Sequence, residues 1–92
     1  MTLQQHDTIN VPKLVHEYLT RFHKHYKLPR HFDEEKELVE WCEPIGTQYR
    51  DWNFYKGHPN DSHCVLHLLD PNWCTIFELR WGHLVIGMLD IK

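Results

Sequence analysis

Apolar residues recur at helical spacing along residues 10–28. The pattern i, i+3, i+4, i+7 is followed by Val11, Leu14, Val15, Tyr18, Leu19, Phe22 and Tyr26. Asn10 is suited to cap such a helix, and Pro29 would end it because proline disfavours helical backbone in the preceding residue. This segment is therefore predicted to form one long amphipathic helix.

A shorter helix is predicted over residues 33–43. Asp33 stands at its start, and further acids follow in the first turn, where the helix dipole favours negative charge. Pro44 would end the helix. Its buried face would consist of Leu38, Trp41 and Cys42.

In the second half of the chain the apolar positions alternate, which is typical of β-strands. Strands are predicted at residues 47–55, 62–70, 73–81 and 84–91, with a connection at 56–61. Pro71–Asn72 and Gly82–His83 would form tight turns. Pairing across these turns places Leu66 opposite Phe77 and Phe77 opposite Met88, on one apolar face. The prediction is an α+β fold with two N-terminal helices packed on one face of a four-stranded antiparallel sheet.

The opposite face of this predicted sheet is also partly apolar. Along it lie His63, Val65, His67, Leu69, Cys74, Ile76, Glu78, Arg80, Val85 and Leu89. Two helices cannot cover both faces, so this face is expected to be exposed. It would carry either isolated apolar residues, as most protein surfaces do, or a contact surface for another protein or a second copy.

The 92 residues and their 41% hydrophobic content predict a single folded domain rather than a disordered chain. Residues 1–9 would be a loose lead-in, 10–43 the helical part and 47–91 the sheet. No stretch is long and apolar enough to span a bilayer, and the start lacks the apolar core of a signal peptide. The three cysteines have no CxxC spacing, which argues against a disulfide framework. A cytosolic protein is expected.

Histidines and cysteines gather around residues 58–74. The group contains His58, His63, Cys64, His67 and Cys74. Zinc needs four converging ligands. On a strand Cys64 would face the core while His63 and His67 face away, so only a partial site of His63, His67 and Cys74 could form. We therefore expect no metal site.

Catalytic motifs are missing from the sequence. It contains no GxSxG, P-loop, HExxH or glycine-rich phosphate cradle. Acids stand close together only in residues 33–43, where a solvated helix face explains them better. We expect neither enzymatic activity nor a cofactor.

The segment RFHKHYKLPRH, residues 21–31, concentrates positive charge in a chain whose net charge is -3. On the predicted helix Arg21, Lys24 and Lys27 would form one stripe, with Arg30 just beyond its end. The helix dipole explains one or two of these cations. Pairing with the acids of residues 33–43 is a second structural explanation. The remaining excess favours contact with a polyanion, most simply a nucleic-acid backbone.

A second segment, YRDWNFYKGH at residues 49–58, places aromatic side chains among cations. Exposed aromatic rings beside cations are typical of proteins that stack single-stranded bases. Alternation places Trp52 and Phe54 on one face of a strand and Tyr49 and Tyr55 on the other. One pair would therefore be buried and the other free for contacts, with Arg50 and Lys56 as secondary contributors.

As a whole, the chain resembles the small phage-encoded anti-CRISPR proteins, in particular inhibitors of type I-F CRISPR-Cas surveillance complexes. The resemblance rests on a small predicted αα-ββββ domain, no catalytic motif, and RFHKHYKLPRH beside an aromatic-basic strand. It implies a non-catalytic inhibitor that binds Cas proteins and the crRNA backbone in the host cytoplasm and blocks hybridisation of target DNA. A monomer without a small-molecule substrate or membrane contact is expected.

The residues expected to contact the partner or its RNA are Arg21, Lys24, Lys27, Arg30, Arg50 and Lys56. Several members of this family are acidic mimics of DNA, whereas the basic segment here favours docking on Cas subunits. The acidic helix could then face their lysines and arginines. Two alternatives stay open: a small RNA- or single-stranded-DNA-binding protein that acts on its own, and a metal-binding enzyme.

Overall fold

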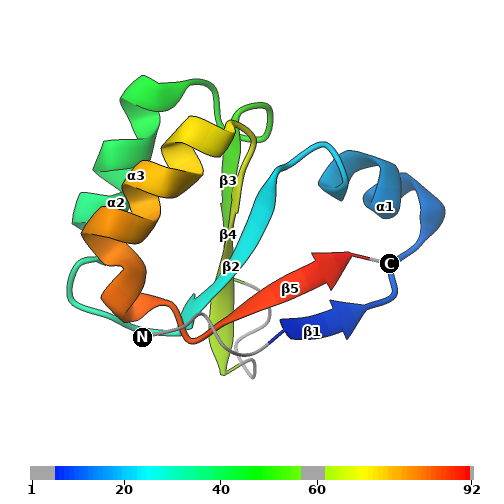
Figure 1. Ribbon diagram of the computed structural model, residues 1–92, viewed down its shortest axis with the longest axis horizontal. Coiled ribbons are helices and arrows are strands. Elements are labelled where there is room, and N and C mark those ends of the chain that lie inside the picture. Colours follow the sequence, from blue (N-terminus) through cyan, green and yellow to red (C-terminus); the bar gives the residue numbers. More distant parts are fainter. Residues whose placement is uncertain (1–5, 57–61, 92) are drawn as a thin grey trace.

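The computed structural model describes residues 6–56 and 62–91, and Figure 1 shows how their helices and strands are arranged. The α-helices are α1 (Lys13–Leu19), α2 (Glu35–Cys42) and α3 (Pro71–Trp81). The strands are β1 (His6–Ile9), β2 (Lys24–Pro29), β3 (Trp52–Tyr55), β4 (His63–Leu68) and β5 (Gly87–Ile91). Short 3-10 turns, η1 (Glu43–Ile45) and η2 (Gly82–Leu84), follow α2 and α3. Within these ranges no helix is both long and apolar enough to cross a membrane.

The strands form one mixed sheet in the order β1-β5-β2-β4-β3. β1 is parallel to β5, and the other neighbouring pairs are antiparallel. The predicted fold of two helices on a four-stranded antiparallel sheet is therefore wrong. The described residues form three helices and a five-stranded sheet with one parallel pair. The loose lead-in is also wrong for His6–Ile9, which is strand β1, while residues 1–5 lie outside the described part.

The main core lies between one face of the sheet and helices α2 and α3, which both lie on that face (Figure 1). It is formed mainly by Tyr26, Leu28, Leu38, Cys42, Leu66, Leu68, Cys74, Phe77 and Trp81, all buried. The ring centroids of Tyr26 and Phe77 are 4.6 Å apart, and those of Trp41 and Trp81 are 4.9 Å apart. The predicted helix over residues 33–43, with Leu38 and Cys42 inside, is confirmed at Glu35–Cys42.

Residues 73–81 form most of helix α3, so the predicted strand there is wrong. The side chain of Asp70 accepts a hydrogen bond from the Asn72 backbone N–H at 2.8 Å, and Pro71 occupies the first helical position. Both residues favour a helix start. The first backbone N–H groups of a helix have no acceptor within the helix, so the Asp70 carboxylate supplies one, and Pro71 has no N–H that would need an acceptor. Gly82 has helical backbone and begins η2, so the predicted hairpin turn is absent. The buried positions, at helical spacing, are Cys74, Phe77 and Trp81.

Residues 24–29 form strand β2 rather than the end of a long helix, and α1 already ends at Leu19. β2 lies inside the sheet, between β4 and β5. Tyr26 is opposite Leu66 on β4 and opposite Met88 on β5. Pairing with two neighbouring strands satisfies the backbone on both sides, and this tertiary context outweighs the helical spacing of the apolar residues.

The second face of the sheet is partly covered by α1, which lies on the side opposite α2 and α3 (Figure 1). Phe22 follows α1 and packs on His67 of β4, with ring centroids 5.4 Å apart. Leu19 and Val65 are buried as well. The prediction that this face is exposed is wrong here, because residues 10–28 divide into a helix and a strand and the helix folds back across the sheet.

Strand β3 is shorter than the predicted strand at residues 47–55, of which 47–51 form a turn. The predicted division of its aromatic residues is confirmed. Trp52 is buried and Phe54 packs against the core, whereas Tyr49 and Tyr55 are exposed. Of the connection predicted at 56–61, residues 57–61 lie outside the described part.

Candidate functional site

The six cations predicted to contact a partner come from several parts of the surface rather than from one helical stripe. Lys24 and Lys27 lie three positions apart on strand β2, so their side chains leave opposite faces of the sheet. Arg21 precedes the strand and Arg30 follows it. The predicted stripe is therefore wrong in its geometry, because it assumed a helix through these positions. Their contact with a partner stays a prediction.

Lys24 takes part in a network on the core face. Its Nζ lies 2.8 Å from Oε2 of Glu78 on α3, and the hydroxyl of the fully buried Tyr26 donates to the same oxygen. Burial opposes ionisation of Glu78, but the hydrogen bonds from Lys24 and Tyr26 outweigh it and lower the pKa of the carboxyl. These contacts connect β2 with α3, so the Lys24 ammonium already has an ion-pair partner within the fold.

Arg30 and Lys56 are also held by contacts inside the molecule. The guanidinium of Arg30 donates to the carbonyl of Lys56, and Nζ of Lys56 lies 2.6 Å from Oε1 of Glu35 on α2. Glu37 of α2 lies 3.5 Å from Arg80, and Glu34, the residue before α2, lies 3.4 Å from His83. These three acids of the predicted acidic helix thus pair with cations outside the basic segment.

Arg21 and Arg50 are brought together at one corner of the molecule, although they belong to different segments. Nη2 of Arg21 donates to the carbonyl of Arg50 at 3.1 Å, and the Tyr18 hydroxyl donates to the carbonyl of Tyr49 at 2.6 Å. The guanidinium carbon of Arg21 lies 5.8 Å from the ring centroids of Tyr18 and Phe22, within cation–π range. We call Tyr18, Arg21, Tyr49 and Arg50 the basic corner.

The turn at residues 47–51 positions half of this corner. Oδ2 of Asp51 accepts a hydrogen bond from the Thr47 N–H at 2.7 Å, and the Thr47 carbonyl accepts from the Asp51 N–H at 2.8 Å. A Cβ on Gly46 would lie 2.3 Å from the Asp51 carboxylate, so only glycine fits beside this closed turn. The turn places Tyr49 in the left-handed region, with φ 72°, and leaves this residue 63% exposed.

The chemistry of the basic corner suits an extended anion with flat groups. The Arg50 side chain is 76% exposed and only 3.8 Å from Oδ2 of Asp51, a contact through Nε that leaves the other guanidinium edge accessible. Two guanidinium groups can each donate paired hydrogen bonds to a phosphate. The exposed ring of Tyr49 beside them offers a stacking surface for a base. For Tyr18, partial burial raises the pKa of the hydroxyl, against the effect of the Arg21 charge.

The residues considered for a metal site are not brought together. His63 and His67 lie on the second face of the sheet, whereas Cys64 and Cys74 are buried on the core side. Among the described residues no group of three or more His, Cys, Asp or Glu side chains is placed to hold a metal ion. His58 lies outside the described residues.

The structure instead places His67 against His25, a pair that the sequence patterns did not indicate. Their Nδ1 atoms are 2.7 Å apart, and both side chains are buried. Burial, together with the smaller effect of the neighbouring His25, lowers the pKa of His67 to about 3. Burial also lowers the pKa of His25, against the opposing effect of Asp90. Both rings are therefore neutral at pH 7, with one Nδ1 donating to the other.

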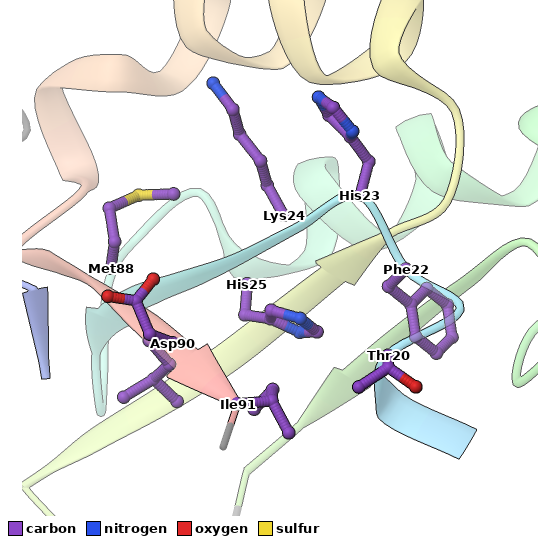
Figure 2. A pocket seen from close by; sticks show the side chains of 9 residues that line it. Thr20, Phe22, His23, Lys24, His25, Met88, Asp90 and Ile91 are labelled. Atoms are coloured by element: carbon purple, nitrogen blue, oxygen red, sulfur yellow. The ribbon is translucent and has the colours of Figure 1, made fainter. Parts of the chain in front are cut away.

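His25 also faces an opening between β2 and the end of β5, where the two strands no longer pair. Figure 2 shows its ring between Phe22 and Asp90 in this pocket, whose volume is about 390 Å³. The pocket is lined by polar and apolar residues together, without a nucleophile activated by a neighbouring base. The three cysteines are free thiols and buried, and none lies in this pocket. We assign no catalytic chemistry to the pocket.

Comparisons with protein-family models, with curated proteins and with solved structures found no match for this chain. Sequence reasoning selected Arg21, Arg50 and Tyr49 but not Tyr18, which the helical pattern assigned wholly to the core. The available indication was the short spacing of Tyr18 and Arg21 in the sequence, although α1 ends at Leu19 and the two residues do not share a helix face.

Proposed function

We propose that this protein is a non-catalytic inhibitor that binds a guide-RNA-loaded CRISPR-Cas surveillance complex through its surface. In this proposal the basic corner contacts the RNA backbone and the surrounding surface contacts Cas subunits. The prevention of target-DNA hybridisation follows from occupying that position. The observation that carries the proposal is the meeting of Arg21 and Arg50 beside the exposed ring of Tyr49.

The arrangement of charge supports contact with RNA at this corner more than along the whole basic segment. Lys24, Arg30 and Lys56 are half-buried and hold partners within the fold. Arg21 and Arg50 also make contacts within the fold, but both residues are exposed. A net charge of -3 with a local cationic corner favours a specific contact over general polyanion binding. The proposal therefore assigns RNA contact chiefly to Arg21 and Arg50.

Binding to an assembled type I-F complex tests this proposal directly. The wild-type protein and an Arg21→Gln/Arg50→Gln variant would be titrated against the guide-RNA complex, with target DNA added afterwards. Loss of charge-assisted hydrogen bonds should weaken binding by about tenfold for each arginine. Loss of two phosphate contacts should also reduce the slope of log K against log salt by about 1.4.

Lys36→Gln is the matched control, because Lys36 is an exposed cation on α2 that lies away from the corner. It should bind and block DNA capture like the wild type. Equal affinity of the wild type for bare guide RNA would instead identify a general RNA-binding protein. Absence of binding to both the complex and the RNA would refute the proposal.

A further inference from the structure

The buried histidine pair on the second face of the sheet has no part in the proposed function. His25 on β2 and His67 on β4 are direct cross-strand neighbours, and their Nδ1 atoms are 2.7 Å apart. The two residues are only 7% and 5% exposed. Phe22 covers them, because its ring centroid lies 6.4 Å from that of His25 and 5.4 Å from that of His67. The pair is therefore enclosed between the sheet and the segment that follows α1.

The contact between the two rings requires that one Nδ1 atom carries a proton and the other does not. A neutral pair meets this requirement, and so does a pair with one additional proton, because that proton can bind to an Nε2 atom. A pair with two additional protons does not meet it. Each imidazolium has an N–H on both nitrogens, so two donors and two positive charges would face each other at 2.7 Å. The rings must then separate.

The groups around the pair determine which ring is protonated last. The charged and titratable residues that line the cavities on its two sides are His23, Lys24 and Asp90 beside His25 (Figure 2), and Tyr18, Lys27, Tyr55 and His63 beside His67. Opposite His67 on β3 lies the uncharged Asn53. Burial lowers the pKa of both rings; the charge of Asp90 partly opposes this at His25, whereas the charge of His25 adds to it at His67. The first proton therefore binds to His25, and the second, on His67, is the one that the closed pair cannot hold.

The segment that covers the pair is weakly attached to the sheet. Helix α1 has seven residues, of which Leu19 is buried, whereas Leu14 is 80% exposed. After the helix, the His23 N–H donates to the Leu68 carbonyl at 2.8 Å. The main core lies on the other face of the sheet and contains neither histidine of the pair. Segments with few buried contacts open at a lower free energy than the whole fold, so this segment can open while the core stays folded.

We propose that the histidine pair is an acid-sensitive latch. When both rings carry a proton they separate, and residues 13–23 leave the second face of the sheet together, while α2, α3 and the sheet stay folded. Opening breaks the hydrogen bonds from Arg21 to the Arg50 carbonyl and from Tyr18 to the Tyr49 carbonyl, so it also takes the basic corner apart. The latch does not depend on contact between that corner and RNA.

Amide hydrogen exchange of the purified full chain, followed by NMR at pH 7 and pH 5, tests the latch. The His23 N–H reports opening of the segment, and the Phe77 N–H, in the middle of α3, reports unfolding of the core. After correction for intrinsic exchange rates, His23 should exchange at least about tenfold faster than Phe77 at either pH. Low concentrations of urea should not change the exchange of His23, because local opening exposes little surface, but should accelerate that of Phe77.

The rise in exchange between pH 7 and pH 5 measures how many protons the open pair takes up. Each ring that binds a proton only after opening shifts the opening equilibrium about 25-fold, since a free histidine titrates near 6.5. The geometry requires one such ring, so the exchange of His23 should rise by about 25-fold, and by about 600-fold if both rings of the closed pair stay neutral. His25→Leu/His67→Leu should abolish this rise. His63→Leu, which removes another histidine from the same face of β4, should retain it.

Three results would overturn the proposal, even if the RNA contact is confirmed. Equal exchange of His23 and Phe77 with the same urea dependence would show that the pair opens only when the protein unfolds. Corrected exchange of His23 that does not change with pH would show that opening is not linked to protonation. An equal rise in the wild type and the His25→Leu/His67→Leu variant would assign the effect to other groups. The first two comparisons use the wild type and hold even if the variant does not fold.

Discussion

The buried His25–His67 pair predicts that the protein loses stability as the pH falls below 7. Both rings are neutral in the folded state because burial disfavours their charged forms. In the unfolded chain each histidine would titrate near the ordinary value of about 6.5. Between that value and the lowered folded pKa the unfolded state binds more protons. The stabilisation is therefore complete above pH 6.5 and is lost as the pH falls towards the folded pKa.

The minimum loss of stability at low pH follows from the pKa of His67. Its folded pKa is about 3, so at pH 5 the folded ring is still neutral while most unfolded rings are protonated. Proton linkage then lowers the free energy of unfolding by about 2 kcal/mol between pH 7 and pH 5. His25 adds a loss of the same sign, because burial lowers its pKa as well and the charge of Asp90 only partly opposes this. For a chain of this size, 2 kcal/mol corresponds to a decrease of about 10 °C in Tm.

Urea unfolding at pH 7 and pH 5, followed by tryptophan fluorescence, measures this loss. A His25→Leu/His67→Leu variant removes both members of the pair together, which leaves neither nitrogen buried without its partner. Its loss of stability over the same pH interval should be smaller than that of the wild type by at least 2 kcal/mol. The single variant His67→Leu should be less stable than the double variant at pH 7, because His25 would keep an unsatisfied buried nitrogen.

His31→Leu is the control, since His31 is exposed and should leave the pH dependence of the wild type unchanged. Equal loss of stability in the wild type and the double variant would refute the reasoning. Such a result would mean that the folded pair accepts a proton as readily as the unfolded chain does.

Three further predictions concern the turn, the helix start and the thiols. Gly46→Ala should destabilise the protein by about 1 to 3 kcal/mol in urea unfolding, because the new Cβ meets the Asp51 side chain that closes the turn; no change would show that the turn can open freely. Asp70→Ala should cost about 1 kcal/mol through loss of the α3 cap, whereas Asp70→Asn should cost less; equal effects would exclude a capping role. Thiol-reactive reagent at pH 8 should label the native protein slowly and the denatured protein fully, because burial raises the pKa of each cysteine, to about 12 for Cys42 and about 11 for Cys64. Rapid native labelling would contradict the buried positions of Cys42, Cys64 and Cys74.

The sequence predicted best those segments in which only one period fits the apolar residues. Helix α2 has a single apolar stripe behind an acidic first turn, and β4 is a short, largely apolar segment that ends before Asp70 and Pro71, so both were found. Residues 73–81 fit two periods. Trp73, Phe77 and Trp81 satisfy alternation and helical spacing alike, and the Asp70–Pro71 helix start would have decided between them.

The sequence indicated some residues of the candidate site, but it did not indicate that these residues come together in the fold. Arg21 was selected because positive charge is concentrated in residues 21–31, and Arg50 because it stands among aromatic residues in residues 49–58. Their meeting depends on where α1 ends and on the closed turn at residues 47–51, which are tertiary features. The His25–His67 pair required the strand assignment of β2, because only a strand places His25 on the face opposite Tyr26.

The parallel pairing of β1 with β5 has a consequence for how the chain folds. His6 is paired with Met88, and β5 lies between β1 and β2 in the sheet although it is the last of the five strands in chain order. During synthesis β1 leaves the ribosome early but has no partner until β5 has emerged. Until then, β2 pairs with β4 on one side only and its other edge is unpaired. Contacts between such distant residues raise the entropy cost of the folding transition state, so folding in milliseconds to seconds is expected. A chain cut before Gly87 would leave β1 without a partner and β2 with one unpaired edge, and β1 would then be available to pair with another molecule.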